Sequence, residues 1–369
     1  MKAKKISILS ALAVVTLAAC NNPSPNDPGS STGPVDLEGT KLTLYSSTSE
    51  ANLKIMIPKF KAETGIDIEY VYGGTGEIVK RVNSEKNSPQ ADVVWLPTQY
   101  VEDNSDCYIS YKAANDAEKP ADFRATTGYC SITNFAIPVI IYNTTMVSKI
   151  EGYSDLVNAS LKGKIAFGDA AKSSSAYNHL ENMLLAMGTG DTVKAKMESE
   201  AAWNYVDSFY SNLDKKIVSS SGTTLTGVVS GEYAVGMSWD TKGYEALQGK
   251  IQDPNGQYKN VEVCYMKEGV VPKTSGVGII KGTKKEAAAK KFVDWMSSKS
   301  GQTVLGKDIA GTNPVLAEAE VASFKKSVSS MKTLAITSQE STDNKKAALA
   351  NNRYAVPCNN HAPADTASR

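Results

Sequence analysis

Three short segments rich in serine and threonine hold the residues best suited to bind a small ligand. Each follows a strand-like stretch and precedes a stretch with helical periodicity. In an open α/β sheet, ligands lie beyond the carboxyl ends of the strands, and the free N–H groups of a following helix attract anions. The candidate residues are Ser46, Ser47 and Thr48, then Ser173, Ser174 and Ser175, then Ser221 and Thr223. The alternative interpretation is that these hydroxyls only cap helices.

A glycine-rich segment, Gly73 to Gly76, forms a fourth candidate because glycine lets a backbone approach a ligand closely. We include Thr75, Gly76 and the adjacent Glu77 in this group. The segment lacks the Lys-Ser/Thr pair of a phosphate-binding P-loop, so nucleotide hydrolysis is not indicated.

An indole and a carboxylate stand together at Trp239 and Asp240, with Tyr244 shortly after them. Trp239 offers an apolar face to a sugar ring or a cation, and Asp240 accepts hydrogen bonds from hydroxyl or ammonium groups. We expect these residues to bind the organic part of a ligand. The alternative is that Trp239 is a core aromatic residue and Asp240 a helix N-cap.

The sequence holds no catalytic or metal-binding motif. Neither a G-x-S-x-G elbow nor an H-E-x-x-H pattern occurs, and the only histidines are His179 and His361. His179 lies inside a predicted helix, and we interpret it as a surface residue rather than a ligand. We therefore expect no enzyme, no resident metal and no cofactor.

The first residues have the layout of a secretory signal, with three lysines before an apolar run from Ile6 to Ala19. The run ends on Leu17-Ala18-Ala19-Cys20, which resembles the lipobox of bacterial lipoproteins and predicts a signal peptide over 1–20 with lipidation of Cys20. The alternative is an ordinary cleavage site with a chance cysteine. Residues 21–36, rich in Asn, Pro, Ser and Gly, predict a flexible tether.

Removing the three lysines of the signal leaves 37 basic residues against 39 acidic ones. This balance gives no electrostatic footprint for nucleic acid.

Four cysteines lie beyond Cys20, and their spacing matches no zinc motif. Because an exported chain meets an oxidising compartment, we expect disulfides. The favoured pairs are Cys107 with Cys130 and Cys264 with Cys358, and the alternative is that all four are reduced.

Strand-like runs alternate with helical patterns along the body of the chain, which indicates βαβ units and a parallel sheet. The segment 132–142 is apolar but interrupted by Pro138, which favours a crossing between two lobes over a central strand. Residues 284–298 show a clear amphipathic helix. We expect an α/β protein with discontinuous lobes joined by hinge strands, lobe 1 from 37–130 plus 271–300 and lobe 2 from 131–270 plus 301–369.

The chain resembles the periplasmic solute-binding proteins of ABC importers, in the branch that contains ferric-ion, sugar-phosphate and 2-aminoethylphosphonate binders. The matching stretches are LTLYSSTSE, FKAETGIDIEYVYGGTGEIVKRV, ADVVWLP, IPVIIYNTT, GKIAFGDAAKSSSAY, GVVSGEYAVGMSWD and KTSGVGIIKGTKKEAAAKKFVDWMSS. The resemblance implies a two-lobed, type II-like periplasmic-binding-protein fold without catalysis, with the solute between the lobes. It also implies an ABC permease and ATPase as partners, and we expect a monomer that is lipid-anchored to the bacterial cell membrane on its periplasmic or extracellular face.

The resemblance is informative at one position where this chain departs from the branch. Ferric binders of the group hold iron with two adjacent tyrosines on the loop that here reads Ser238-Trp239-Asp240-Thr241. The tyrosine pair is absent, although Tyr244, Asp240 and Glu77 could still supply oxygen ligands. We therefore favour an organic anion bearing phosphate or phosphonate, with ferric ion or a surface adhesin role as the alternatives.

Overall fold

The computed structural model describes residues 37–214, 217–218, 222–351 and 353. The predicted signal peptide, Cys20, the tether, Ser221, Cys358 and His361 lie outside these residues. In the described part of the chain, no helix is both long and apolar enough to cross a bilayer.

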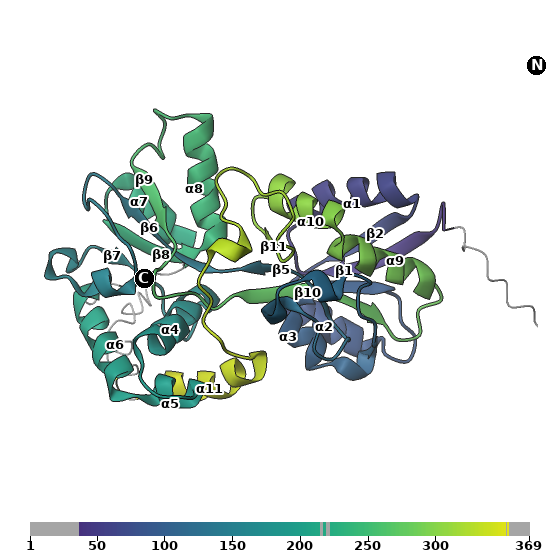
Figure 1. Cartoon of the computed structure of the whole chain (residues 1–369), viewed down its shortest axis with the longest axis horizontal. Helices are drawn as coiled ribbons and strands as arrows, with labels where there is room; N and C mark the ends of the chain where they lie inside the picture. The colour runs from purple at the N-terminus through teal and green to yellow at the C-terminus, as the bar shows by residue number, and fades with distance from the viewer. Residues whose placement is uncertain (1–36, 215–216, 219–221, 352, 354–369) are drawn as a thin grey trace, which may run out of the picture. The chain divides into compact units, whose positions relative to one another are not determined.

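Two separate sheets organise the described chain (Figure 1). The first has the order β11-β5-β10-β3-β1-β2, with β4 paired to β10. Its strands are β1 (Lys41–Ser46), β2 (Asp67–Tyr72), β3 (Val93–Pro97), β4 (Tyr108–Ile109), β5 (Ser131–Ala136), β10 (Lys273–Ile280) and β11 (Asn313–Pro314). Strands β1, β2 and β3 are parallel, as the alternation of strand and helix patterns predicted, whereas β10 runs antiparallel to β3.

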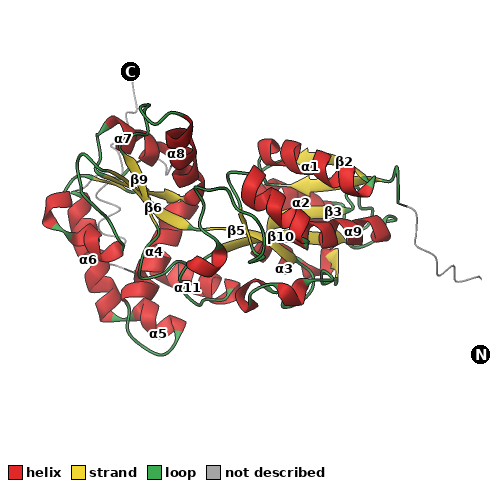
Figure 2. Cartoon of the chain, turned by 45° about the horizontal axis from the view of Figure 1, so that its top comes forward, coloured by secondary structure: helices red, strands yellow, loops and turns green. Residues whose placement is uncertain are grey.

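Helices cover both faces of the first sheet (Figure 2). They are α1 (Glu50–Thr64), α2 (Thr75–Ser84), α3 (Thr98–Glu102), α9 (Glu286–Ser297) and α10 (Lys299–Thr303). Helix α1 starts at the Ser49 cap and stops at Gly65, whose φ of 70° suits glycine. The predicted apolar face of α9 packs on α1, with Phe60 5.1 Å from Phe292 and 5.3 Å from Trp295 between ring centroids.

The second sheet has the order β7-β8-β6-β9. Its strands are β6 (Pro138–Asn143), β7 (Ile165–Ala166), β8 (Val235–Trp239) and β9 (Val261–Cys264). Its helices are α4 (Ser174–Met187), α5 (Val193–Glu198), α6 (Glu200–Leu213), α7 (Gly222–Ser230) and α8 (Asp240–Gln252). Pro138 opens β6, a position where the missing N–H costs no ladder hydrogen bond.

The chain passes between the sheets where the sequence predicted a crossing, since β5 belongs to the first sheet and β6 to the second, with Ile137 between them. It returns through the residues that join β9 to β10. The predicted lobe boundaries shift, however, because β5 and β11 both lie in the first sheet. Residues 131–136 and 301–314 therefore belong with lobe 1, and α11 (Ser338–Ala350) follows as the last described helix.

The predicted Cys107–Cys130 disulfide is wrong, because both residues are free buried thiols and Cys264 is free as well. Cys130 directly precedes β5, whereas the Cys107 carbonyl accepts a hydrogen bond from Lys281 N at 2.9 Å, just after β10.

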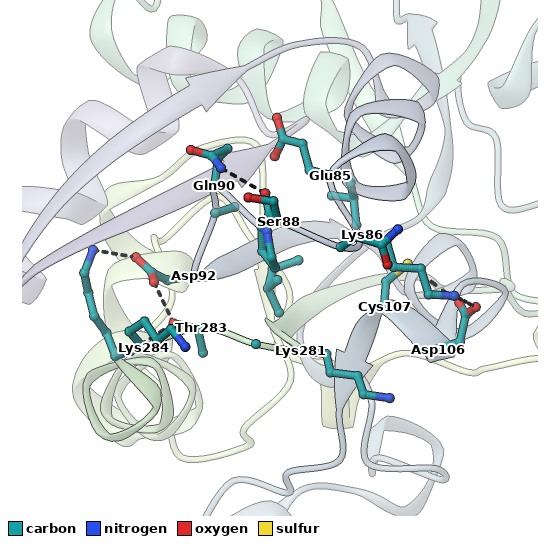
Figure 3. A pocket seen from close by; sticks show the side chains of 17 residues that line it. Glu85, Lys86, Ser88, Gln90, Asp92, Asp106, Cys107, Lys281, Thr283 and Lys284 are labelled. Carbon is teal, nitrogen blue, oxygen red and sulfur yellow. Dashed lines mark hydrogen bonds and ion pairs between the residues drawn. The ribbon is translucent and has the colours of Figure 1, made fainter.

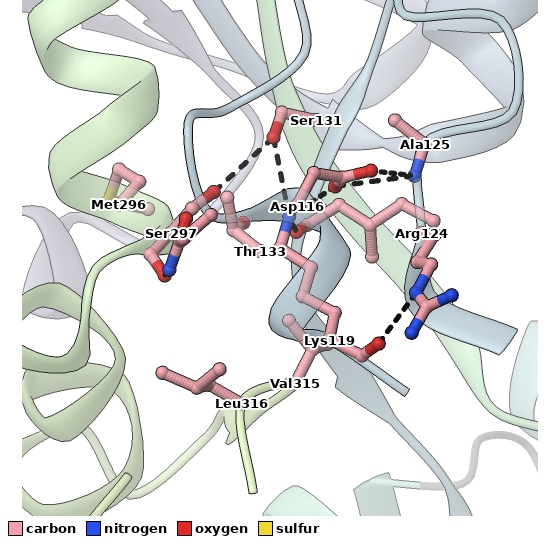
Figure 4. A network of polar contacts seen from close by, with 12 residues as sticks. Asp116, Lys119, Arg124, Ala125, Ser131, Thr133, Met296, Ser297, Val315 and Leu316 are labelled. Atoms are coloured by element: carbon pink, nitrogen blue, oxygen red, sulfur yellow. Dashed lines mark hydrogen bonds and ion pairs between the residues drawn. The ribbon is translucent and has the colours of Figure 1, made fainter. Parts of the chain in front are cut away.

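A fully buried lysine holds the polar segment 110–130 between β4 and β5, called the excursion below (Figure 4). Lys119 Nζ donates to Asp116 Oδ1 at 3.0 Å, to Ser131 Oγ at 3.4 Å and to the Ile132 carbonyl at 2.7 Å. Asp116 in turn accepts from the backbone N–H of Ala125 at 3.1 Å. The excursion is thus tied directly to β5, the strand that leads into the crossing.

Candidate solute-binding site

The first hydroxyl segment closes the carboxyl end of β1. Ser46 is fully buried, donates to the Trp95 carbonyl at 3.0 Å and accepts from Thr48 N at 3.0 Å. Ser47 and Thr48 are half-buried. Ser46 therefore holds the shape of the loop, and Ser47 and Thr48 are the hydroxyls left to meet a solute.

The glycine segment begins α2. Glu77 is exposed, and its Oε2 accepts from Gly74 N at 3.1 Å, which makes it the acidic partner of a capping arrangement. Thr75 and Gly76 are the first residues of the helix. The structure gives Glu77 a local capping contact and leaves its possible role with a solute as a prediction.

The second hydroxyl segment begins α4. Ser173 is the N-cap and accepts from Ala176 N at 3.3 Å, and Ser174 is exposed beside it. Ser175 is 1% exposed, and its Oγ has no hydrogen-bond partner among the described residues. A buried hydroxyl without a partner is costly, so Ser175 is the strongest candidate contact of this segment.

His179 lies on the same helix and corrects the sequence prediction of a surface residue. Its side chain is fully buried, with Nδ1 3.0 Å from Tyr153 Oη and Nε2 3.0 Å from the Ser238 carbonyl. Burial lowers the pKa of His179 to about 4. The neutral ring therefore ties α4 to the end of β8, just before Trp239.

An ion pair that sequence reasoning missed lies two residues further along α4. The Glu181 carboxylate is fully buried and accepts from Lys273 Nζ at 2.6 Å. Lys273 starts β10, in the first sheet, so the pair spans the two lobes. The only signal in the sequence is a carboxylate, followed by Asn182, between the apolar residues Leu180 and Met183.

Asp240 is held by contacts within the protein through Oδ2, while its buried Oδ1 has no hydrogen-bond partner among the described residues, so its role with a solute stays a prediction. It is 1% exposed, and its Oδ2 accepts from Ile137 N at 3.2 Å and from Asn313 Nδ2. It is the first residue of α8 rather than its N-cap, which is Trp239. Asp240 therefore pins the crossing residue Ile137 and β11 to the second lobe.

Tyr244 belongs to the same hinge cluster and cannot serve as an exposed oxygen ligand. It is fully buried, and its Oη donates to Asn313 Oδ1 at 2.5 Å. Burial raises the pKa of Asp240 to about 7 and lowers that of Lys325 to about 7. Lys325 Nζ donates to three backbone carbonyls, which requires the ammonium form.

The structure does not decide the role of two further predicted residues. Trp239 is half-buried at the end of β8, and Thr223 is exposed in the first turn of α7. Both keep the predicted solute-binding role as a prediction. No three His, Cys, Asp or Glu side chains gather to hold a metal ion within the described residues.

A pocket of about 770 Å³ lies at the end of the first sheet opposite the hydroxyl-rich segment that follows β1 (Figure 3). It is lined by the loop before β3 and the turn after β10, and Asp92 there accepts from Thr283 at 2.6 Å and Lys285 at 3.1 Å. These residues meet the amino ends of the parallel strands. Because α/β sheets bind ligands at the carboxyl ends, this pocket is not the predicted site.

The two sheets, the crossing segments and the polar groups at their junction define a two-lobed binding protein. The chain belongs to the family of bacterial extracellular solute-binding proteins, whose model matches residues 56–348. This membership makes it a binding protein and not an enzyme, as the sequence predicted.

Known proteins agree with this assignment. A probable ABC transporter periplasmic-binding protein of Sinorhizobium fredii is 24% identical over 284 residues, 75% of each chain. The periplasmic binding protein AfuA of Actinobacillus pleuropneumoniae, solved with exogenous fructose-6-phosphate bound, has a TM-score of 0.63 and 21% identity, covering 85% of this chain and 97% of its own.

The ferric iron-binding protein A of Mannheimia haemolytica, in an open conformation, has a TM-score of 0.69 and 19% identity, covering 87% of this chain and 99% of its own. At such identities the solved structures establish the fold alone. The predicted periplasmic-binding-protein fold is thereby confirmed.

Proposed function

We propose that this chain is the extracytoplasmic solute-binding component of an ABC importer and that it captures an organic anion bearing a phosphate or phosphonate group. The observation that supports this most is the start of α4, where the buried hydroxyl of Ser175 has no hydrogen-bond partner among the residues that the structure describes. Backbone N–H groups and the helix dipole favour an anion there. The relatives' names agree with transport by an ABC system.

Ferric ion is the second candidate because several similar structures are named as ferric-binding proteins. The residues of this chain favour it less. The tyrosine pair is absent from the loop after β8, and Tyr244 already donates its hydroxyl hydrogen to Asn313. An organic anion fits the hydroxyl-rich segments without requiring Tyr244 to leave the hinge cluster.

Calorimetry with fructose 6-phosphate, 2-aminoethylphosphonate and ferric citrate tests the solute class. We expect binding of a phosphorylated compound, weakened about tenfold to a hundredfold by Ser175→Ala, since a hydrogen bond to a charged group contributes about 1.5–3 kcal/mol. Ser208→Ala, on the exposed face of α6, is the matched control. Tight ferric binding without heat from either organic compound would overturn the assignment.

We also propose that Cys20 carries a lipid that anchors the protein to the outer face of the cell membrane, with residues 21–36 as the tether. Two acyl chains anchor a protein stably, because each buried methylene contributes about 0.8 kcal/mol. Replacing Cys20 with alanine should move the protein from the detergent phase to the aqueous phase in a partitioning experiment. Unchanged partitioning of the Cys20→Ala variant would exclude the anchor.

A further inference from the structure

The hydroxyl of Ser341 contacts both members of the ion pair that Glu181 and Lys273 form between the lobes. Ser341 of α11 donates to Glu181 Oε1 and accepts from Lys273 Nζ at 2.9 Å, while the same ammonium donates to Glu181 Oε2 at 2.6 Å. A hydroxyl is both a donor and an acceptor, and here each capacity meets an opposite charge. This arrangement matches the chemistry by which a protein recognises an alcohol.

Near this hydroxyl, two buried polar side chains of α4 have atoms without a hydrogen-bond partner among the described residues. Asn178, one turn before Glu181, is 1% exposed; its Nδ2 donates to Glu181 Oε2 at 3.4 Å, and its Oδ1 has no partner in the described part of the chain. Ser175, another turn back, has the partnerless hydroxyl described above. Buried polar atoms normally have partners, so this stripe of α4 is incompletely satisfied without a ligand.

Helix α11 holds its place over this stripe by polar contacts. Its Ser341 carbonyl accepts from Tyr177 Oη at 3.4 Å, its Thr342 contacts Gln99 of α3, and Lys345 Nζ lies 4.8 Å from the centre of the Tyr177 ring. Of the α11 side chains whose burial is described, only Ala348 is buried. Few buried apolar contacts mean that the helix can leave at low cost.

We propose that Glu181 and Lys273 bind one hydroxyl of the solute, that Asn178 binds a neighbouring one, and that Ser341 occupies this subsite until the solute displaces α11. The proposal rests on the proposed function and narrows the solute to a polyhydroxylated anion, such as a sugar phosphate. The anionic group lies toward Ser175 at the start of α4, and the hydroxyl-bearing carbons lie along the helix toward Glu181.

Titration of the full chain with fructose 6-phosphate and with inorganic phosphate tests this subsite. Glu181→Gln should weaken fructose 6-phosphate binding by about tenfold or more and leave inorganic phosphate unchanged, because phosphate has no carbon-borne hydroxyl. Ser341→Ala should tighten fructose 6-phosphate binding by about tenfold, because the internal competitor is gone. Lys346→Ala, an exposed change on the same helix, is the matched control.

Ser341→Ala keeps the test decisive even if Glu181→Gln fails to fold, since Ser341 is only half-buried. Equal fructose 6-phosphate affinities for wild type, Ser341→Ala and Lys346→Ala would overturn the subsite while leaving the proposed function standing. Equal losses of fructose 6-phosphate and phosphate in Glu181→Gln would overturn it as well. If the wild-type chain binds none of the phosphorylated compounds, the proposed function itself fails, and the subsite with it.

Discussion

Replacing Lys119 with methionine should lower the free energy of unfolding by about 3–5 kcal/mol, because it breaks a buried ion pair from one side. The ammonium is fully buried and uses all three of its donors, on Asp116, Ser131 and Ile132. Without it, the Asp116 carboxylate remains in the interior with the Ala125 N–H as its one hydrogen-bond donor among the described residues. Burial also lowers the pKa of Lys119, against the attraction of Asp116.

Urea unfolding of wild type and Lys119→Met measures this loss. The double variant Asp116→Asn, Lys119→Met should recover part of it, since no uncompensated charge then remains. Lys112→Met, on the exposed surface of the same excursion, should change stability by less than about 0.5 kcal/mol. A loss below about 1 kcal/mol in Lys119→Met would show that the buried pair does not hold the excursion to β5.

The consequence for function lies in where the network is attached. Ser131 and Ile132 belong to β5, and β5 leads through Ile137 into the second lobe. For the first lobe to move as a rigid body, β5 must stay fixed to the rest of that lobe, and the Lys119 contacts fix it there. At the end of the crossing that enters the second lobe, Asp240 holds Ile137 and Asn313.

Local sequence signals were enough to predict the elements whose pattern repeats over many residues. Helix α9 was evident because Ala288, Phe292, Trp295 and Met296 recur at helical spacing, and all four are buried. Strand β11 was invisible because it has two residues and no pattern of its own. The later boundary of lobe 1 depended on that strand, so it could not be placed from the sequence.

The candidate site divides in the same way. The serines at the start of α4 were found because helix N-termini have a local signature. The contact between Asp240 and Asn313 was missed because a carboxylate after a strand looks the same whether it meets a solute or a distant residue. Glu181 and Lys273 are 92 positions apart and come together only through the packing of two lobes.

Lowering the pH from 6.5 to 4 should cost the protein about 3 kcal/mol of stability through His179 alone. The folded pKa of this histidine is about 4 because the ring is buried, whereas the unfolded chain titrates near 6.5. Between these values the unfolded chain binds a proton that the folded chain does not. Stability therefore falls as the pH drops through this window and is unaffected above it.

Asp240 acts in the opposite direction, because burial raises its pKa to about 7 and the folded state then binds a proton before the unfolded chain does. Its contribution to stability increases as the pH falls from about 7 to about 4. The pH profile of the wild type alone therefore mixes the two effects. The comparison must be made between variants at each pH.

His179→Gln separates them, because an amide can still donate to the Ser238 carbonyl and accept from Tyr153 without taking up a proton. We expect the difference in unfolding free energy between wild type and this variant to shrink or reverse from pH 7.5 to pH 4.5 in urea titrations. His361→Gln, which removes the other histidine of the sequence, is the control. A difference independent of pH would mean that His179 titrates normally and does not fasten α4 to β8 as a neutral ring.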